Sequence, residues 1–209
     1  MTSPRLPENS FRVVERARLS HPDKLATGSA ALAAAFAWGF AEAIFFFIVP
    51  DVLLTMIATR SLRSAIKATI AALAGALVGG GLLTAFAHGS PDAGRALLLH
   101  IPGINAHLLE RVMGQVDERG LLAVLLGPLK GIPYKIYAVE WGRRGGGLFA
   151  FLLISIPARW VRFALVAVIA RAVARLIEPL TRHRAGIEGL VLAIIWTAFY
   201  IFYFARFGW

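Results

Sequence analysis

Charged residues that lie inside apolar stretches are the first candidates for function in this sequence. Glu42 and Asp51 lie in one such stretch, and Lys130 and Lys135 lie in another. Poorly solvated carboxylates can take up and release protons, and ammonium groups bind phosphate as point charges. The pattern therefore predicts proton coupling at the two acidic residues and binding of an anionic substrate at the two lysines.

Two arginines lie near the middle of a third apolar stretch. Arg159 and Arg162 are three residues apart and so share one face of a helix. An arginine at the centre of a bilayer costs about 2.5–3.5 kcal/mol on insertion scales, so it should face protein or a wet cavity. We predict that both bind substrate, with Pro157 kinking the helix beside them. A span that starts later, with Arg159 at the membrane interface, is the alternative.

The composition indicates an integral membrane protein. The chain has 209 residues, of which 58% are hydrophobic, and its mean hydropathy is +0.68. The net charge of +10 does not predict nucleic-acid binding, because the basic residues lie between apolar runs. Cysteine is absent, and no histidine has a metal-ligand spacing, so we expect no metal, no cofactor and no catalytic residue.

The segment from Gly120 to Gly142 is too interrupted to be one straight span. Pro128 and Pro133 remove backbone hydrogen bonds, and charged residues lie at what would be membrane depth. A chain that enters, turns between Gly127 and Pro133 and leaves on the same side has limbs of roughly 15 Å, about half a hydrocarbon core. We predict a re-entrant hairpin with Pro128, Gly131 and Pro133 at its tip, lining a cavity at mid-membrane.

The first apolar stretch has two interpretations. Either residues 29–49 span the membrane alone, or the stretch to Thr59 is a second re-entrant hairpin with Pro50 at its tip. The basic loop at residues 60–67 should lie on the same side as the basic N-terminal tail, which requires an even number of crossings between them. The hairpin is therefore preferred.

The remaining segments are predicted as plain spans and loops. Gly75 and Gly79, in the span expected at residues 66–87, permit close packing against a neighbouring helix. The expected segments are a basic tail at 1–28, either an interfacial helix or a loose tail; a span at 66–87; surface helices outside the core at 88–119; a span at 148–170; a basic loop at 171–186; and a span within 187–209, ending in the interfacial anchors Tyr200, Phe202, Tyr203, Phe207 and Trp209. A cleaved signal peptide is not expected, because the first apolar run begins near Ser29 and contains Glu42.

These segments predict an all-α integral membrane protein built as an inverted repeat. Two re-entrant helical hairpins are each followed by a transmembrane helix, and a C-terminal transmembrane helix is added. One crossing separates the two units, which inverts the second relative to the first, as in many secondary transporters. The basic segments and the N-terminus then lie on the cytoplasmic side.

The polar positions in the apolar background resemble those of the DedA superfamily, also called the SNARE-associated or VTT-domain family, and most of all its short bacterial members. The likeness covers residues 29–170: an acidic residue followed by Pro50-Asp51, a Gly-rich span, the hairpin GPLKGIPYK ahead of AVEWG, and an arginine-bearing span. Family acidic residues correspond to Glu42 and Asp51. Family arginines correspond to Lys130 and, shifted by one, to Lys135. The family's proline-rich run is reduced here to Pro50.

The resemblance implies transport or scrambling of anionic lipids, of the undecaprenyl phosphate or phospholipid class, with proton coupling, in the bacterial inner membrane. Anionic lipid headgroups and the bilayer are the expected partners, and a homo-oligomer is compatible with the sequence. A structural or assembly protein of the membrane is one alternative, in which the acidic residues and arginines form ion pairs that only make insertion tolerable. A lipid phosphatase is another, for which we find no nucleophile and base in a known spacing.

Overall fold

The structure is a computed structural model that describes residues 28–181 and 187–207. All regular secondary structure in these ranges is helical, as expected. The elements are α2 (Ser29–Ile44), α3 (Asp51–Arg60), α4 (Leu62–Gly89), α5 (Pro91–Leu99), α6 (Ala106–Arg119), α7 (Leu121–Leu126), the 3₁₀ turn η1 (Pro128–Lys130), α8 (Tyr134–Arg143), α9 (Leu148–Thr181) and α10 (Ile187–Phe207). The predicted N-terminal interfacial helix and Trp209 lie outside the described residues.

Three of the described helices are long and apolar enough to cross a membrane, namely Leu62–Gly89, Leu148–Glu178 and Gly189–Arg206. The shorter apolar helices are Ser29–Ile44 and Leu121–Lys130. This composition is consistent with an integral membrane protein.

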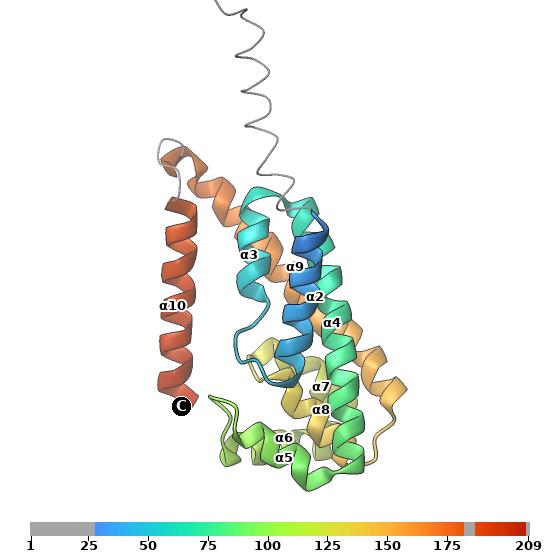
Figure 1. The fold of residues 1–209 in the computed structure, drawn as a ribbon. Helices are drawn as coiled ribbons and strands as arrows, with labels where there is room; N and C mark the ends of the chain where they lie inside the picture. The colour runs from blue at the N-terminus through green and yellow to red at the C-terminus, as the bar shows by residue number, and fades with distance from the viewer. Residues whose placement is uncertain (1–27, 182–186, 208–209) are drawn as a thin grey trace, which may run out of the picture.

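The first broken segment consists of α2 and α3. Helix α2 ends at Ile44, and α3 begins at Asp51, directly after Pro50. Proline disfavours helical geometry in the residue before it, which explains why the chain is not one continuous helix here. The chain turns back, so that the start of α2 and the end of α3 lie at the same end of the molecule (Figure 1).

Helices α2 and α4 approach closely because glycine faces backbone on both sides. A Cβ added at Gly39 would lie 2.1 Å from the Ala72 carbonyl oxygen, and one at Gly75 would lie 2.0 Å from the Phe36 carbonyl oxygen. No side chain fits at such distances. The predicted use of Gly75 for close helix packing is confirmed.

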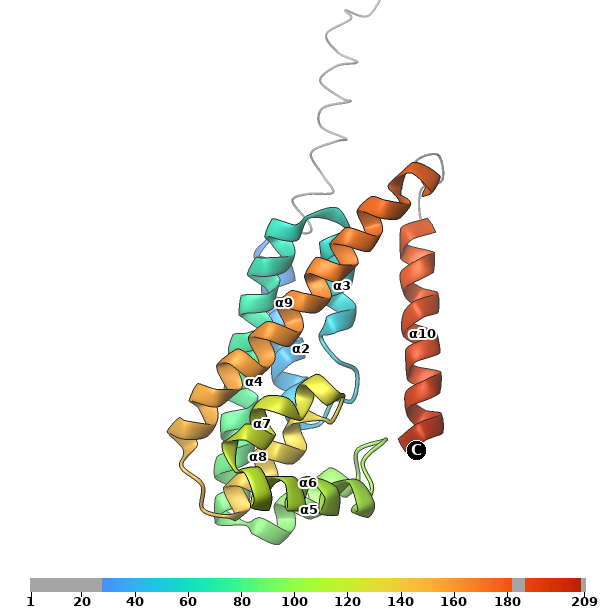
Figure 2. The same ribbon diagram turned by 180° about the vertical axis from the view of Figure 1, so that it is seen from behind.

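The second broken segment is formed by α7, η1 and α8. The breaks fall at Pro128 and Pro133, where backbone donors are missing, and Gly131 adopts a left-handed conformation with φ of +81°. This segment enters from the end of the molecule opposite to α2, and its tip approaches the loop between α2 and α3 (Figures 1 and 2). The long helices α4 and α9 extend past both broken segments.

The polar segment between α4 and α7 folds as the expected helices, α5 and α6. Asn105 caps α6 by accepting a hydrogen bond from the backbone N–H of Leu108 at 2.9 Å. They are surface helices as predicted, but they are not outside the protein core, because Leu98, Leu109 and Val112 are buried in the main hydrophobic cluster. Both helices are amphipathic, and their apolar faces cover one end of the bundle.

The prediction of a basic loop at residues 171–186 is wrong for residues 171–181, because α9 continues to Thr181. No glycine or proline interrupts the sequence between Pro157 and Pro179, and alanine, leucine and arginine favour helix. Arg171 donates a hydrogen bond to the carbonyl oxygen of Thr59, so its charge contacts the end of α3. Helix α9 also continues through Pro157.

Candidate functional site

The centre of the candidate site is an ion pair between α2 and α9. Arg159 donates a hydrogen bond from Nη2 to Oε2 of Glu42. The two residues are 0% and 3% exposed, respectively. A buried charge needs a partner, and here each is the partner of the other across 117 positions of sequence.

Aromatic rings cover the guanidinium of Arg159. Its Cζ lies 4.6 Å from the centroid of the Tyr134 ring and 4.8 Å from that of the Phe163 ring. Tyr134 is fixed in turn by donating a hydrogen bond to Ser155 at 2.8 Å. Within the described part of the chain, Nε and Nη1 of Arg159 have no hydrogen-bond partner, so the ring faces supply the remaining stabilisation of this cation.

A second ion pair lies one helical turn along α9. Arg162 Nη2 donates to Asp51 Oδ2 at 2.6 Å, and the Asp51 side chain is 2% exposed. Asp51 is the first residue of α3, where a carboxylate is favoured by the helix dipole. Its other oxygen, Oδ1, is buried and has no hydrogen-bond partner among the described residues.

Lys135 connects the two broken segments. Its Nζ donates to the carbonyl oxygen of Phe46 at 3.1 Å and lies 3.9 Å from Oε1 of Glu42. Lys135 is 2% exposed although it is the second residue of α8. The tip of the second segment therefore contacts the loop of the first through a buried ammonium group.

The structure does not bring Lys130 into this cluster. Lys130 is exposed at the end of η1 and lines a separate shallow pocket with Gln115 and Arg119. Five of the six charged residues selected from the sequence thus lie together, and one does not. With ordinary ionisation, these five comprise three cations and two anions, so the cluster has one cation in excess.

A cavity of about 50 Å³, which we call the polar cavity, lies beside the cluster, and its lining combines charged side chains with apolar ones such as Phe47, Ile101 and Ile132. This space is sufficient for a few water molecules. The lining includes Glu42, Lys135 and Arg162, the tip residues Gly131 and Pro133, and α10. The tip positions Pro50 and Pro128 are buried close to the two chain breaks.

Helix α10 contributes aromatic residues to this cavity. Tyr200 and Tyr203 line it, and the hydroxyl of Tyr200 accepts a hydrogen bond from the backbone N–H of Val49 at 2.9 Å. The interpretation of these two tyrosines as interfacial anchors did not include these contacts with protein. Phe202, which is 68% exposed, faces outward.

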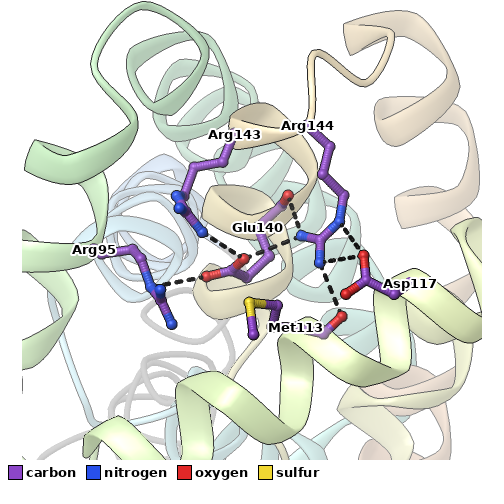
Figure 3. A network of polar contacts seen from close by, with 6 residues as sticks. All are labelled: Arg95, Met113, Asp117, Glu140, Arg143 and Arg144. Carbon is purple, nitrogen blue, oxygen red and sulfur yellow. Dashed lines mark hydrogen bonds and ion pairs between the residues drawn. The ribbon is translucent and has the colours of Figure 1, made fainter.

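A second polar cluster surrounds the buried Glu140 on α8 (Figure 3). Its Oε2 accepts hydrogen bonds from Arg143 and Arg144, each at 3.0 Å, and its Oε1 lies 3.4 Å from Nε of Arg95. Arg144 also donates to Asp117 at 2.8 Å. These contacts tie α8 to α5 and α6 and fix the base of the second broken segment.

Sequence reasoning missed the aromatic and hydroxyl residues of the site, namely Tyr134, Phe163 and Ser155. They carry no charge, and tyrosine and phenylalanine are common in apolar segments. One signal was present for Tyr134, which lies between Pro133 and Lys135 at the tip of the predicted hairpin.

Comparison with known proteins gives one informative relative. A protein of Haemophilus influenzae, described as an uncharacterized protein, is 30% identical over 131 residues, covering 63% of this chain and 67% of the relative. No family model and no solved structure matches the chain.

Proposed function

We propose that this chain, which belongs to the same family as the Haemophilus influenzae protein, is a carrier or scramblase of anionic lipids with two re-entrant hairpins. The buried charge cluster where the two broken segments meet is the observation that carries the proposal. The likeness to the DedA superfamily points to the same class of function and is part of the proposal.

The lengths of the helices support a half-crossing arrangement. Helices α3 and α8 have 10 residues each and so extend about 15 Å, half of a hydrocarbon core about 30 Å thick, and the other limbs, α2 with 16 residues and α7 with 6, are also too short to cross it. Helix α4 has 28 residues and extends about 42 Å, enough to cross completely. Non-helical backbone at membrane depth is tolerated where protein or water covers it. The two breaks lie against each other here, because Lys135, directly after the loop at 127–133, donates a hydrogen bond to the carbonyl oxygen of Phe46 in the loop at 45–50.

The excess cation gives the site its selectivity in this proposal. Moving an anionic headgroup across a bilayer is opposed mainly by loss of its hydration. Lys135 and Arg162 line the polar cavity and would replace part of that hydration with charge-assisted hydrogen bonds. Since the cavity holds only a few waters in this conformation, the walls must part to admit a headgroup.

Glu42 and Asp51 are the proposed proton carriers. Each is paired with an arginine, and an incoming phosphate would compete for that arginine. Protonation of the displaced carboxylate would remove the buried negative charge left behind. Binding of the anion and of the proton are thus linked.

The test is lipid flipping in reconstituted vesicles, comparing undecaprenyl phosphate with phosphatidylethanolamine, with and without a pH gradient. We expect faster flipping of the anionic lipid and a response to the gradient. Lys135→Met should slow it about tenfold, equivalent to about 1.4 kcal/mol. Lys67→Met removes an exposed lysine of α4 and is the matched control. Equal rates in the wild type, Lys135→Met and protein-free vesicles would refute the proposal.

One observation favours a second candidate, a structural or assembly protein of the membrane. In the pairs Glu42–Arg159 and Asp51–Arg162, each charge already has a partner of opposite sign without any ligand. That candidate does not explain why Lys135 adds a further buried cation beside a polar cavity. Absence of flipping together with full stability of the purified protein would favour it.

A further inference from the structure

An apolar groove of about 220 Å³ lies between α3, α9 and α10, on the side of the molecule where α2 begins. Its lining includes Val166, Ala170 and Ala174 of α9, and Val191 and Ile195 of α10. Helix α10 contacts α3 and α9, and Tyr200 also binds the loop at 45–50. The groove is therefore the space between α10 and the two helices α3 and α9.

The few polar side chains of the groove form hydrogen bonds within the protein. Trp196 donates from Nε1 to Oγ1 of Thr55 at 3.0 Å, and Thr55 itself donates to the carbonyl oxygen of Val52 at 2.9 Å. Thr59 donates to the carbonyl oxygen of Met56 at 2.9 Å. A surface whose polar groups are already satisfied suits hydrocarbon better than water.

The length of the groove matches one leaflet. Its α9 wall extends from Val166 to Ile177, which is about 16 Å at helical rise. Half of a hydrocarbon core is about 15 Å. A single hydrocarbon chain lying in the groove would therefore extend from mid-membrane to one interface.

The groove begins about one helical turn from the polar cavity. On α9, Arg162 lines the cavity and Val166, one turn further, lines the groove. On α10, Tyr200 lines the cavity and Trp196 lines the groove, with ring centroids 6.2 Å apart. On α3, Asp51 binds Arg162, and Thr55 one turn later lines the groove.

We infer that the groove binds one hydrocarbon chain of the lipid whose anionic headgroup occupies the polar cavity. This inference rests on the proposed function and adds the second half of the binding site. The change from charged to apolar lining within one turn of each helix matches the change from headgroup to chain in an anionic lipid. Helix α10 is then the wall that must move for the lipid to enter sideways.

Photolabelling tests the inference without requiring transport. The protein is reconstituted in phosphatidylcholine vesicles with traces of phosphatidic acid carrying a diazirine at the end of one acyl chain. Phosphatidylcholine with the same diazirine measures labelling by bulk lipid. We expect phosphatidic acid to label residues 166–177 and 191–196 several-fold above that baseline, and unlabelled phosphatidic acid to compete.

Two alanines of α9 give matched variants. Ala170 lines the groove, whereas Ala172 is exposed and does not line it. Ala170→Phe should abolish the excess labelling and Ala172→Phe should retain it. Labelling of the wild type at the bulk-lipid baseline would overturn the inference, even if lipid flipping is intact. Specific labelling without any flipping would preserve the groove and overturn the proposed function instead.

Discussion

Arg159 shows how strongly a single buried residue depends on its surroundings. Its charge is neutralised by Glu42, and its guanidinium contacts the rings of Tyr134 and Phe163. A buried ion pair is weak evidence for net stability, since desolvation offsets much of the attraction. Removal of one partner is nevertheless costly, because it leaves the other charge buried without compensation.

This asymmetry gives a prediction for the two partners. Glu42→Gln leaves Arg159 and Lys135 as neighbouring buried cations and should destabilise the protein by about 3–5 kcal/mol. Arg159→Met should cost less, because Glu42 keeps Lys135 at 3.9 Å. Unfolding in detergent micelles measures both values.

Two further variants control that measurement. Arg63→Met removes an exposed arginine of α4 and should change stability by less than about 0.5 kcal/mol. In the double variant Glu42→Gln/Arg159→Met, the cost should fall below the sum of the single costs by about 0.5–3 kcal/mol. Strict additivity would contradict a direct interaction between the two side chains.

The contact between α2 and α4 determines whether this cluster can form. Glu42 lies one turn after Gly39, where the backbone of α4 leaves no space for a side chain, and the backbone of α2 leaves none at Gly75. Any group larger than hydrogen would push α2 away from α4 and shift Glu42 relative to Arg159. The two glycines thus determine how close α2 lies to α4, and with it the position of Glu42 in the charge cluster.

A pair of glycine substitutions tests this dependence. Gly75→Ala should destabilise the protein by about 1–3 kcal/mol, because its Cβ would lie 2.0 Å from the Phe36 carbonyl oxygen. Gly114→Ala, in α6 with no atom within 4 Å of the added Cβ, should stabilise it by about 0.5–1 kcal/mol. Thermal unfolding of both variants measures the difference. A Gly75→Ala variant as stable as the wild type would mean that α2 and α4 are further apart.

The helix breaks could be predicted from the sequence, because local backbone chemistry determines them. Pro50, Pro128 and Pro133 fall at the observed breaks, because proline acts on its own residue and the one before it. The direction of a side chain could not be predicted as well. Lys130 and Lys135 belong to the same motif, but only Lys135 lies on the inner face of a regular helix.

The end of α9 and the contacts of α10 were not predicted either. Arg171 suggested a loop by its charge, yet it extends α9 because its guanidinium binds the end of α3. Tyr200 suggested an interfacial anchor by its type, yet it faces the polar cavity because α10 packs beside the loop at 45–50. In both cases the side chain contacts a segment more than 100 positions away, which residue type alone does not reveal.

At the scale of the whole molecule, the two broken segments begin and end at opposite ends of the bundle (Figures 1 and 2). The end of α3 that lies away from the loop is adjacent to the part of α9 around Arg171, which binds the carbonyl oxygen of Thr59. The bases of α7 and α8 lie at the other end, beside α5, α6 and the Glu140 cluster. If the bundle is embedded along its long axis, each broken segment opens to only one side of the membrane.

Because the chain has no cysteine, single-cysteine variants can test this arrangement with a thiol reagent that does not cross membranes. Ser29 at the start of α2, Arg60 at the end of α3 and Arg175 near the end of α9 are exposed, and these helix ends lie at one end of the bundle (Figure 1). Ser90 between α4 and α5 and Gly147 directly before α9 are exposed, and these connections lie toward the other end. We expect Ser29→Cys, Arg60→Cys and Arg175→Cys to react from one side of sealed vesicles, and Ser90→Cys and Gly147→Cys to react from the opposite side.

The pair Ser29 and Arg60 is decisive, because a segment that crosses only once would place them on opposite sides. Gly147 tolerates a side chain, since no atom lies within 4 Å of an added Cβ. Reaction of Ser29→Cys and Arg60→Cys from different sides would exclude the re-entrant arrangement, and with it the meeting of two half-crossing segments on which the lipid carrier depends.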